Sequence, residues 1–363
     1  MGNGSSLLKK LFNGNGDKNE VMNTEDIIDL SVNTNPLGMP KSAKLAITRE
    51  MELYAQYPDP QCTALSERIA QHYPGISAKQ VLCVSGVDDA ICRIIAAQQP
   101  RKALILAPTY EDYEGALRNA GCAVTYHFLQ KEEKYQTTET ILDSLTHDID
   151  MFFLCNPNNP TGQVIERKLL NQIVDKCQEN GTILVVDESF IGFLDKPEEY
   201  TAKGLIHAYT NLIILDGFTK LYAMPGLRLG FCISNNEELL GKIFAAGQPW
   251  NVSTPAQVAG IAALKDKKYL KETQEVILTE KKWLLNELSK LKIEVWGSCA
   301  NYLFFPAPFP NTRKLLREDN ILLRNCENFV GLNGEFCRIA IRTHHENEEF
   351  IAAIRRHVIS GEH

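Results

Sequence analysis

The stretch NLIILDGFTKLYAMPGLRLGF, Asn211–Phe231, decides how the fold of this chain is interpreted. Its branched apolar run Leu212–Leu215 predicts a buried strand, and Asp216-Gly217 predicts the loop that ends it. Lys220 follows in that loop among apolar neighbours. Desolvation lowers the pKa of a lysine and makes its amine nucleophilic, as a Schiff-base lysine requires. A lone loop lysine is more often a plain surface residue, so the rest of the chain has to decide.

An arginine lies eight residues beyond this lysine, in the segment PGLRLGF. Pro225 and Gly226 bend the backbone there, which lets the guanidinium of Arg228 turn back toward a phosphate near Lys220.

The composition excludes several classes of protein. The chain has 363 residues and a formal net charge of −7, without a long basic stretch, which argues against a nucleic-acid partner. No apolar run approaches the roughly 18 residues of a membrane span, and no signal-peptide segment is recognisable, so we expect a cytoplasmic protein. The ten cysteines are scattered without a CxxC pair, which predicts neither a metal site nor disulfides.

Short apolar strands alternate with helical patterns over the first two thirds of the chain. This alternation predicts an α/β fold whose mainly parallel sheet is covered on both faces. The predicted strands are Val81–Val84, Ala103–Leu106, Ala123–Phe128, Met151–Cys155, Ile183–Val186 and Leu212–Leu215. The C-terminal part predicts a smaller α+β domain, with the charged helix Lys268–Lys290 bridging the two and strands at Ile293–Trp296, Tyr302–Phe305, Ile321–Arg324 and Cys337–Ile341.

Polar residues follow the carboxyl ends of the predicted strands, which is where ligands bind in such sheets. Gly86 opens a helix whose first amides, at Val87 and Asp88, can face an anion. Tyr110 offers a stacking face, and Asn159 offers an amide donor. Taken alone, these residues have ordinary explanations: a capped helix, core packing and an asparagine turn.

Asp187 ends an apolar strand and needs a cationic partner there, such as a protonated pyridine nitrogen. These residues together supply a partner for a pyridine nitrogen, a phosphate cradle, a stacking face, a donor to a ring oxygen and a Schiff-base lysine. This combination predicts pyridoxal 5′-phosphate (PLP) as cofactor.

The motifs NPNNPTG (156–162), VVDES (185–189), Thr219-Lys220 and PGLRLGF (225–231) resemble those of fold-type-I PLP enzymes, specifically the histidinol-phosphate aminotransferase branch. The resemblance implies an N-terminal arm at 1–44, a large PLP-binding domain at 45–245 and a small domain at 246–363. It also implies a homodimer with shared active sites, in which Tyr57 reaches the cofactor phosphate of the neighbouring subunit.

Within that branch, DLSVNTNPLG (29–38), Phe190 and the arginines near the C-terminus look more like threonine-phosphate decarboxylases of cobalamin biosynthesis. This resemblance implies that Arg338 holds the substrate carboxylate and that Arg324 and Asn33 contact its phosphate, with Arg342 as a further substrate-binding candidate. Those decarboxylases begin with a His-Gly-Gly-Asn segment, whereas this chain has FNGNG at 12–16, with two lysines at 9 and 10 as substitute cations.

The sequence therefore predicts a PLP-dependent decarboxylase of a small O-phospho amino acid. An aminotransferase acting on histidinol phosphate or a related amino acid is the alternative, because both reactions use nearly the same motif residues. A non-catalytic protein with the same fold is a third hypothesis.

Overall fold

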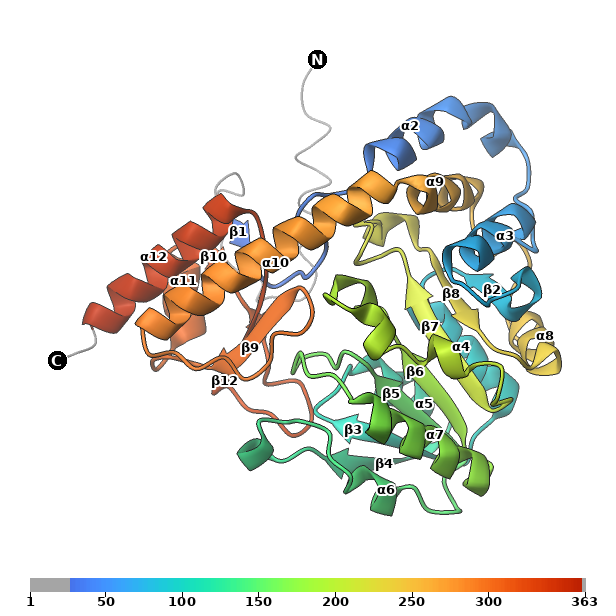
Figure 1. The fold of residues 1–363 in the computed structure, drawn as a ribbon, viewed down its shortest axis with the longest axis horizontal. Coiled ribbons are helices and arrows are strands. Elements are labelled where there is room, and N and C mark those ends of the chain that lie inside the picture. The colour runs from blue at the N-terminus through green and yellow to red at the C-terminus, as the bar shows by residue number, and fades with distance from the viewer. Residues whose placement is uncertain (1–26, 361–363) are drawn as a thin grey trace.

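The computed structural model describes residues 27–360 and consists of a large sheet sandwiched by helices and a C-terminal lobe beside it (Figure 1). The large sheet has seven strands in the order β2-β8-β7-β6-β5-β3-β4. Their bounds are β2 Val81–Val84, β3 Lys102–Ala107, β4 Ala123–Phe128, β5 Met151–Cys155, β6 Ile183–Asp187, β7 Leu212–Gly217 and β8 Gly230–Ile233.

The large sheet is parallel except for β8. That strand pairs antiparallel with both β2 and β7, whereas β3 to β7 pair in parallel. The expected fold, a mainly parallel sheet with a smaller C-terminal domain, is confirmed. β8 was not predicted as a strand. Because it runs antiparallel to β2 and β7, it begins at the edge of the sheet where those two strands end.

Both faces of this sheet are buried, and alternate strand residues supply two separate cores. On β6, Leu184 and Val186 belong to one core, and Val185 belongs to the other. The first core also takes residues from α3 (Thr63–His72), α7 (Arg167–Asn180) and α9 (Thr254–Lys265); the second takes them from α4 (Val87–Gln98), α5 (Asp112–Asn119) and α8 (Glu237–Ala245). Double-sided burial explains why these strands are continuous apolar runs.

The C-terminal lobe is built on a small antiparallel sheet in the order β11-β12-β9, with β9 Tyr302–Pro306, β11 Arg324–Asn325 and β12 Phe336–Ala340. The long helix α10 (Lys267–Lys290) runs from α9 into this lobe and lies beside α12 (His344–Ser360), as Figure 1 shows. The N-terminal strand β1 (Ile28–Asp29) pairs with β10 (Ile321–Leu322), and α11 (Thr312–Glu318) completes the lobe. The remaining helix of the N-terminal segment, α2 (Lys41–Arg49), contacts α9, and the short α6 (Ile141–Ser144) contacts α7.

The strand predicted at Ile293–Trp296 is wrong. That segment is irregular, and only a single bridge from Gly297 to Phe304 pairs it with β9. Gly297 is pressed against the turn after β5, where a Cβ at its position would lie 1.6 Å from the carbonyl oxygen of Thr161. The amides of Trp296 and Gly297 both donate to the carbonyl of Phe304, at 2.8 and 3.2 Å, so the pairing does not extend along the segment. The helix α8 was not predicted either, and the domain boundaries remain predictions.

Candidate functional site

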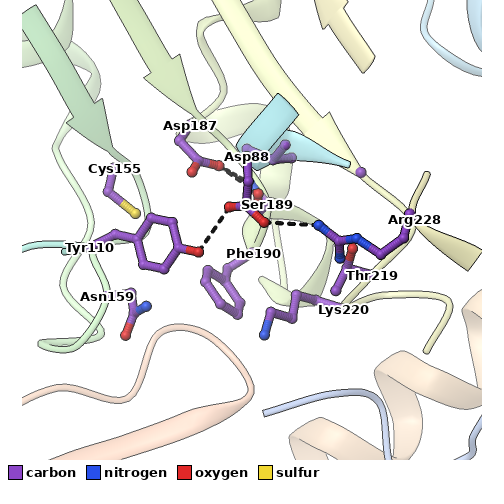
Figure 2. A pocket seen from close by; sticks show the side chains of 12 residues that line it. Asp88, Tyr110, Cys155, Asn159, Asp187, Ser189, Phe190, Thr219, Lys220 and Arg228 are labelled. Carbon is purple, nitrogen blue, oxygen red and sulfur yellow. Dashed lines mark hydrogen bonds and ion pairs between the residues drawn. The ribbon is translucent and has the colours of Figure 1, made fainter. Parts of the chain in front are cut away.

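A cavity of about 240 Å³ opens at the edge of the large sheet where the parallel strands end. Figure 2 shows the labelled side chains, among them Tyr110, Asp187 and Lys220, facing this space. The predicted residues that line it are Val87, Asp88, Tyr110, Asn159, Asp187, Thr219, Lys220 and Arg228. The topology explains this convergence, because residues that follow parallel strands meet at one edge. Arg228 precedes β8, which runs the opposite way and therefore starts at the same edge.

The amine of Lys220 lies in this cavity without a carboxylate in direct contact. Its Nζ donates a hydrogen bond to Oδ1 of Asn33 at 3.1 Å and lies 5.8 Å from the ring centre of Phe190. Burial and, after it, the positive charge of Arg338 lower the pKa of Lys220 to about 8. About a tenth of this amine is therefore neutral and nucleophilic at pH 7, and about half of it at pH 8.

The carboxylate of Asp187 is buried at the base of the cavity and held in a fixed orientation. Tyr113 donates its hydroxyl to Oδ2 at 2.6 Å, while the amide and hydroxyl of Ser189 donate to Oδ1 at 3.0 and 2.6 Å. Burial raises the pKa of Asp187 despite these donors. The buried negative charge would be stabilised most by a cation placed against it inside the cavity.

The start of α4 forms the predicted phosphate cradle. Gly86 precedes this helix with φ +90°, and a Cβ there would lie 2.7 Å from Nη2 of Arg228, so glycine lets the guanidinium approach. The guanidinium pairs with Asp88 at 2.9 Å, and Tyr110 donates its hydroxyl to the other oxygen of that carboxylate at 2.9 Å (Figure 2). Helix-start amides together with an arginine provide an anion site.

Two predicted substrate arginines project from the small sheet toward this region. Arg324 on β11 lies directly opposite Arg338 on β12, so the two side chains leave the same face of the sheet. Arg338 is buried; Nη1 donates to Oδ1 of Asn159 at 2.6 Å and Nη2 to the carbonyl of Ser31 at 2.7 Å. Its Nε has no hydrogen-bond partner among residues 27–360. Burial lowers the pKa of Arg338 to about 10.

Six of the predicted residues are not among those that line the cavity: Gly86, Asn33, Arg324, Arg338, Arg342 and Tyr57. Arg342 pairs with Glu346 at 3.2 Å, at the start of α12. Tyr57 is 81% exposed and rests on Trp250, with ring centres 4.8 Å apart. The lysines at positions 9 and 10 and the segment FNGNG lie outside the described residues. The roles proposed for Arg342 and Tyr57 stay predictions.

Sequence reasoning missed several residues of the site. Ser189 could have been found, because a serine two residues after an aspartate commonly donates back to that carboxylate. Tyr113 gave no such signal, since it reaches Asp187 from a helix 74 positions earlier in the chain. Cys155 and Gly217 also line the cavity.

The residues present fit PLP by their chemistry. Asp187 is a fixed buried acceptor for a ring N–H, Arg228 and the start of α4 can hold a phosphate, and Lys220 carries a nucleophilic amine. Asn159 uses its carbonyl oxygen on Arg338, which leaves its amide free to donate to a ring oxygen. Among residues 27–360, no cluster of His, Cys, Asp and Glu is arranged to hold a metal ion, and no helix is long and apolar enough to cross a bilayer.

Comparisons with known proteins agree with this chemistry. The family described as aminotransferase class I and II matches residues 25–354. The threonine-phosphate decarboxylase of Salmonella typhimurium is 34% identical over 93% of this chain and 92% of its own length. A histidinol-phosphate aminotransferase of Methanosphaera stadtmanae is 28% identical over 91% and 90%. The crystal structure of the histidinol-phosphate aminotransferase from Clostridium acetobutylicum superposes with a TM-score of 0.85 at 31% identity, covering 92% of this chain and 99% of that one. The chain therefore belongs to the aminotransferase class I and II family, and pyridoxal 5′-phosphate is its cofactor.

Proposed function

We propose that this chain is a PLP-dependent decarboxylase of an O-phospho amino acid, L-threonine O-3-phosphate or a close analogue, which it converts to aminopropanol phosphate and CO₂. The observation that carries this choice is the likeness to the Salmonella typhimurium threonine-phosphate decarboxylase over nearly the whole chain. The geometry of the small sheet supports the substrate class independently.

The paired arginines suit a substrate with two anionic groups. Arg338 is buried and has an unpaired Nε, so a carboxylate beside Asn159 would satisfy a donor that otherwise costs folding free energy. Arg324 lies opposite it on the neighbouring strand and is more exposed, in keeping with a second anion nearer to solvent. An O-phospho amino acid carries its carboxylate and phosphate a few bonds apart, which matches two cross-strand arginines.

The chain's own residues would determine which bond of the substrate breaks. When bound, PLP supplies an electron sink for the pair released at the substrate's Cα, and Asp187 keeps that sink effective by holding the ring N–H. Arg338 would orient the carboxylate so that the bond from Cα to it is the one that breaks. CO₂ would leave, and Lys220 Nζ, in its ammonium form, would give one proton to Cα.

The wall beside Lys220 favours this assignment. Phe190 is 4% exposed, packs edge-on against Tyr302 and lies 5.8 Å from the amine, so one wall of the cavity beside the amine is apolar. A phenyl ring excludes water and has no hydroxyl that could share proton transfer with Lys220. The lysine amine would therefore be the group that protonates Cα.

The alternative is an aminotransferase, which the likeness to the Clostridium acetobutylicum structure favours. Incubating the holoenzyme with L-threonine phosphate and trapping CO₂ separates the two. We expect stoichiometric CO₂ and aminopropanol phosphate. Absence of CO₂ would reject decarboxylation, and a parallel incubation of glutamate with the ketone analogue of histidinol phosphate that yields histidinol phosphate and the keto acid of glutamate would establish transamination.

A homodimer with shared active sites is part of the same proposal. Tyr57 and Trp250 form an exposed aromatic pair, and Met51 nearby in sequence is 60% exposed. Exposed large apolar side chains of this kind are typical of an interface. Light scattering coupled to gel filtration should give twice the mass of one chain, and Tyr57→Ala together with Trp250→Ala should shift that mass toward a single chain. A monomeric wild-type protein would contradict the proposal.

A further inference from the structure

The carboxylate of Glu111 is bound by two donors from the C-terminal lobe. Nη2 of Arg324 donates to Oε1 at 3.1 Å, and the side-chain amide of Asn328 donates to Oε2. Glu111 lies immediately before α5, directly after Tyr110, whose ring lines the main cavity. The two donors therefore hold an anion beside the cavity, and in this structure that anion belongs to the chain itself.

This carboxylate lies within electrostatic reach of the substrate site. Arg324 is the cross-strand neighbour of the buried Arg338. Burial is the main cause that lowers the pKa of Arg338. The positive charge of Arg324 lowers this pKa further, and the negative charge of Glu111 raises it. Tyr110, Glu111 and Asn328 also border a small hollow of about 20 Å³, and Tyr110 is common to this hollow and the main cavity. The guanidinium of Arg324 is further fixed over the ring of Phe329, 4.9 Å from its centre.

We propose that Glu111 is a displaceable counter-ion, which occupies the place that the phosphate group of the substrate takes against Arg324 and Asn328. This inference rests on the proposed phosphorylated substrate and adds Glu111 and Asn328 to the residues that determine its binding. Glu111 thus competes with the substrate and weakens the binding of its phosphate.

The strengths of the two interactions favour displacement. The side chains of Arg324 and Glu111 are 27% and 42% exposed, and ion pairs with that much solvent contribute little net stability. A phosphate group carries more charge than a carboxylate and brings more acceptor oxygens to the same guanidinium and amide. The two anions repel each other at such short range, so binding of phosphate would move Glu111 toward solvent. This movement would break the link between the start of α5 and the loop that contains Asn328.

Glu111→Gln tests the competition in the holoenzyme, where the cofactor already fills its own phosphate site. We expect the inhibition constant of inorganic phosphate and the KM for L-threonine phosphate to fall roughly three- to tenfold. Glu335→Gln is the matched control, because Glu335 is another exposed acid, paired with Lys131 at 3.4 Å, and should change neither constant. Weaker or unchanged phosphate binding in Glu111→Gln would overturn the proposal.

A second pair of variants shows whether Glu111 acts through Arg324. Arg324→Gln should weaken phosphate binding, and adding Glu111→Gln to it should then change the inhibition constant by less than about twofold. Asn328→Ala should weaken phosphate binding in the Glu111→Gln background. An equal gain from Glu111→Gln with and without Arg324, or no effect of Asn328→Ala, would overturn the assignment.

The result stays interpretable if decarboxylation fails. An enzyme that releases no CO₂ but transaminates histidinol phosphate would refute the proposed reaction, and phosphate inhibition of that transamination would still test Glu111. If the holoenzyme binds inorganic phosphate equally well with and without Glu111 by calorimetry, the counter-ion role is refuted whichever reaction the enzyme catalyses.

Discussion

Two lysines in the interior of the large domain have opposite electrostatic environments. Lys203 donates to Glu188 at 2.6 Å and to Asp216 at 2.9 Å, and its ammonium lies 4.6 Å from the ring centre of Tyr73. Burial alone would lower the pKa of Lys203, but the charges of Asp216 and Glu188 outweigh it and raise that pKa above its ordinary value. Lys220 is also largely desolvated, yet its polar contact is the neutral amide of Asn33, and its pKa falls.

The comparison shows that desolvation does not by itself make a lysine reactive. Both amines lose hydration, but two carboxylates keep one of them charged, and the absence of a touching carboxylate lets the other lose its proton. Two carboxylates contact the amine of Lys203 and stabilise its charged form, whereas the amine of Lys220 contacts the neutral amide of Asn33. Variants of the two lysines and of their partners can break or sharpen this contrast.

Lys220→Ala should have the largest effect, on activity. The amine is the proposed attachment point of the cofactor and the proton donor to Cα, so we expect turnover to fall by at least about 10³-fold, with the fold intact. The absorbance near the visible edge that a lysine-bound cofactor gives should disappear. A Lys220→Ala protein that keeps this absorbance would refute the assignment of the lysine.

Lys203→Met should have the largest effect on stability. Removing the cation leaves Glu188, which is fully buried, and Asp216 as uncompensated charges, so the free energy of unfolding should fall by about 3–5 kcal/mol. Urea unfolding at pH 7 measures this loss. The double variant Lys203→Met/Glu188→Gln should recover part of it, and a single variant as stable as the wild type would show that the cluster does not depend on its cation.

The sequence predicted those parts of the fold and the site that depend on local pattern. Strands buried on both faces must be continuous apolar runs, so β5, β6 and β7 were recognisable. Polar residues at or shortly after their ends, such as Asp187 and Asn159, were recognisable too. The strand β8 was not, because its position between β2 and β7 depends on pairings with strands far away in the sequence.

The contacts that set the chemistry of the site were the least predictable. Asn33 reaches Lys220 across 187 positions of the chain. The resemblance implied a contact of that asparagine with the substrate phosphate, which stays a prediction, but it gave no sign of this contact with Lys220. The donor to Glu111 was equally hidden, since Arg324 lies 213 positions away. Such pairs follow from how the N-terminal strand and the small sheet pack on the large domain, which no local pattern encodes.

Asn33→Asp should convert the environment of Lys220 toward that of Lys203. A carboxylate in place of the amide oxygen, 3.1 Å from Nζ, favours the ammonium and should raise the pKa of Lys220 above about 8 by roughly one to three pH units. The neutral amine is the reactive form, so the acidic limb of the pH profile should move to higher pH. The rate at which cofactor attaches to cofactor-free protein, measured against pH, gives this shift.

Asn33→Leu is the matched control for that measurement. It removes the acceptor of the ammonium without adding charge, so the pKa of Lys220 should move downward or stay near 8, and the acidic limb should not move to higher pH. Equal upward shifts in both variants would mean that loss of the amide, and not the new charge, alters the profile, which would contradict the explanation of the contrast between the two lysines.

Lys271→Met should have the smallest effect of these variants, on both stability and the pH profile. Lys271 lies on the exposed side of α10 and approaches Glu275 at 3.7 Å, with the two side chains 79% and 63% exposed. Solvent screens such a pair and the lysine loses little hydration, so neither the urea midpoint nor the pH profile of cofactor attachment should change beyond experimental error. A loss of stability comparable to that of Lys203→Met would mean that the number of lysine–carboxylate contacts, and not their burial, governs stability, and the distinction between the two interior lysines would lose its physical basis.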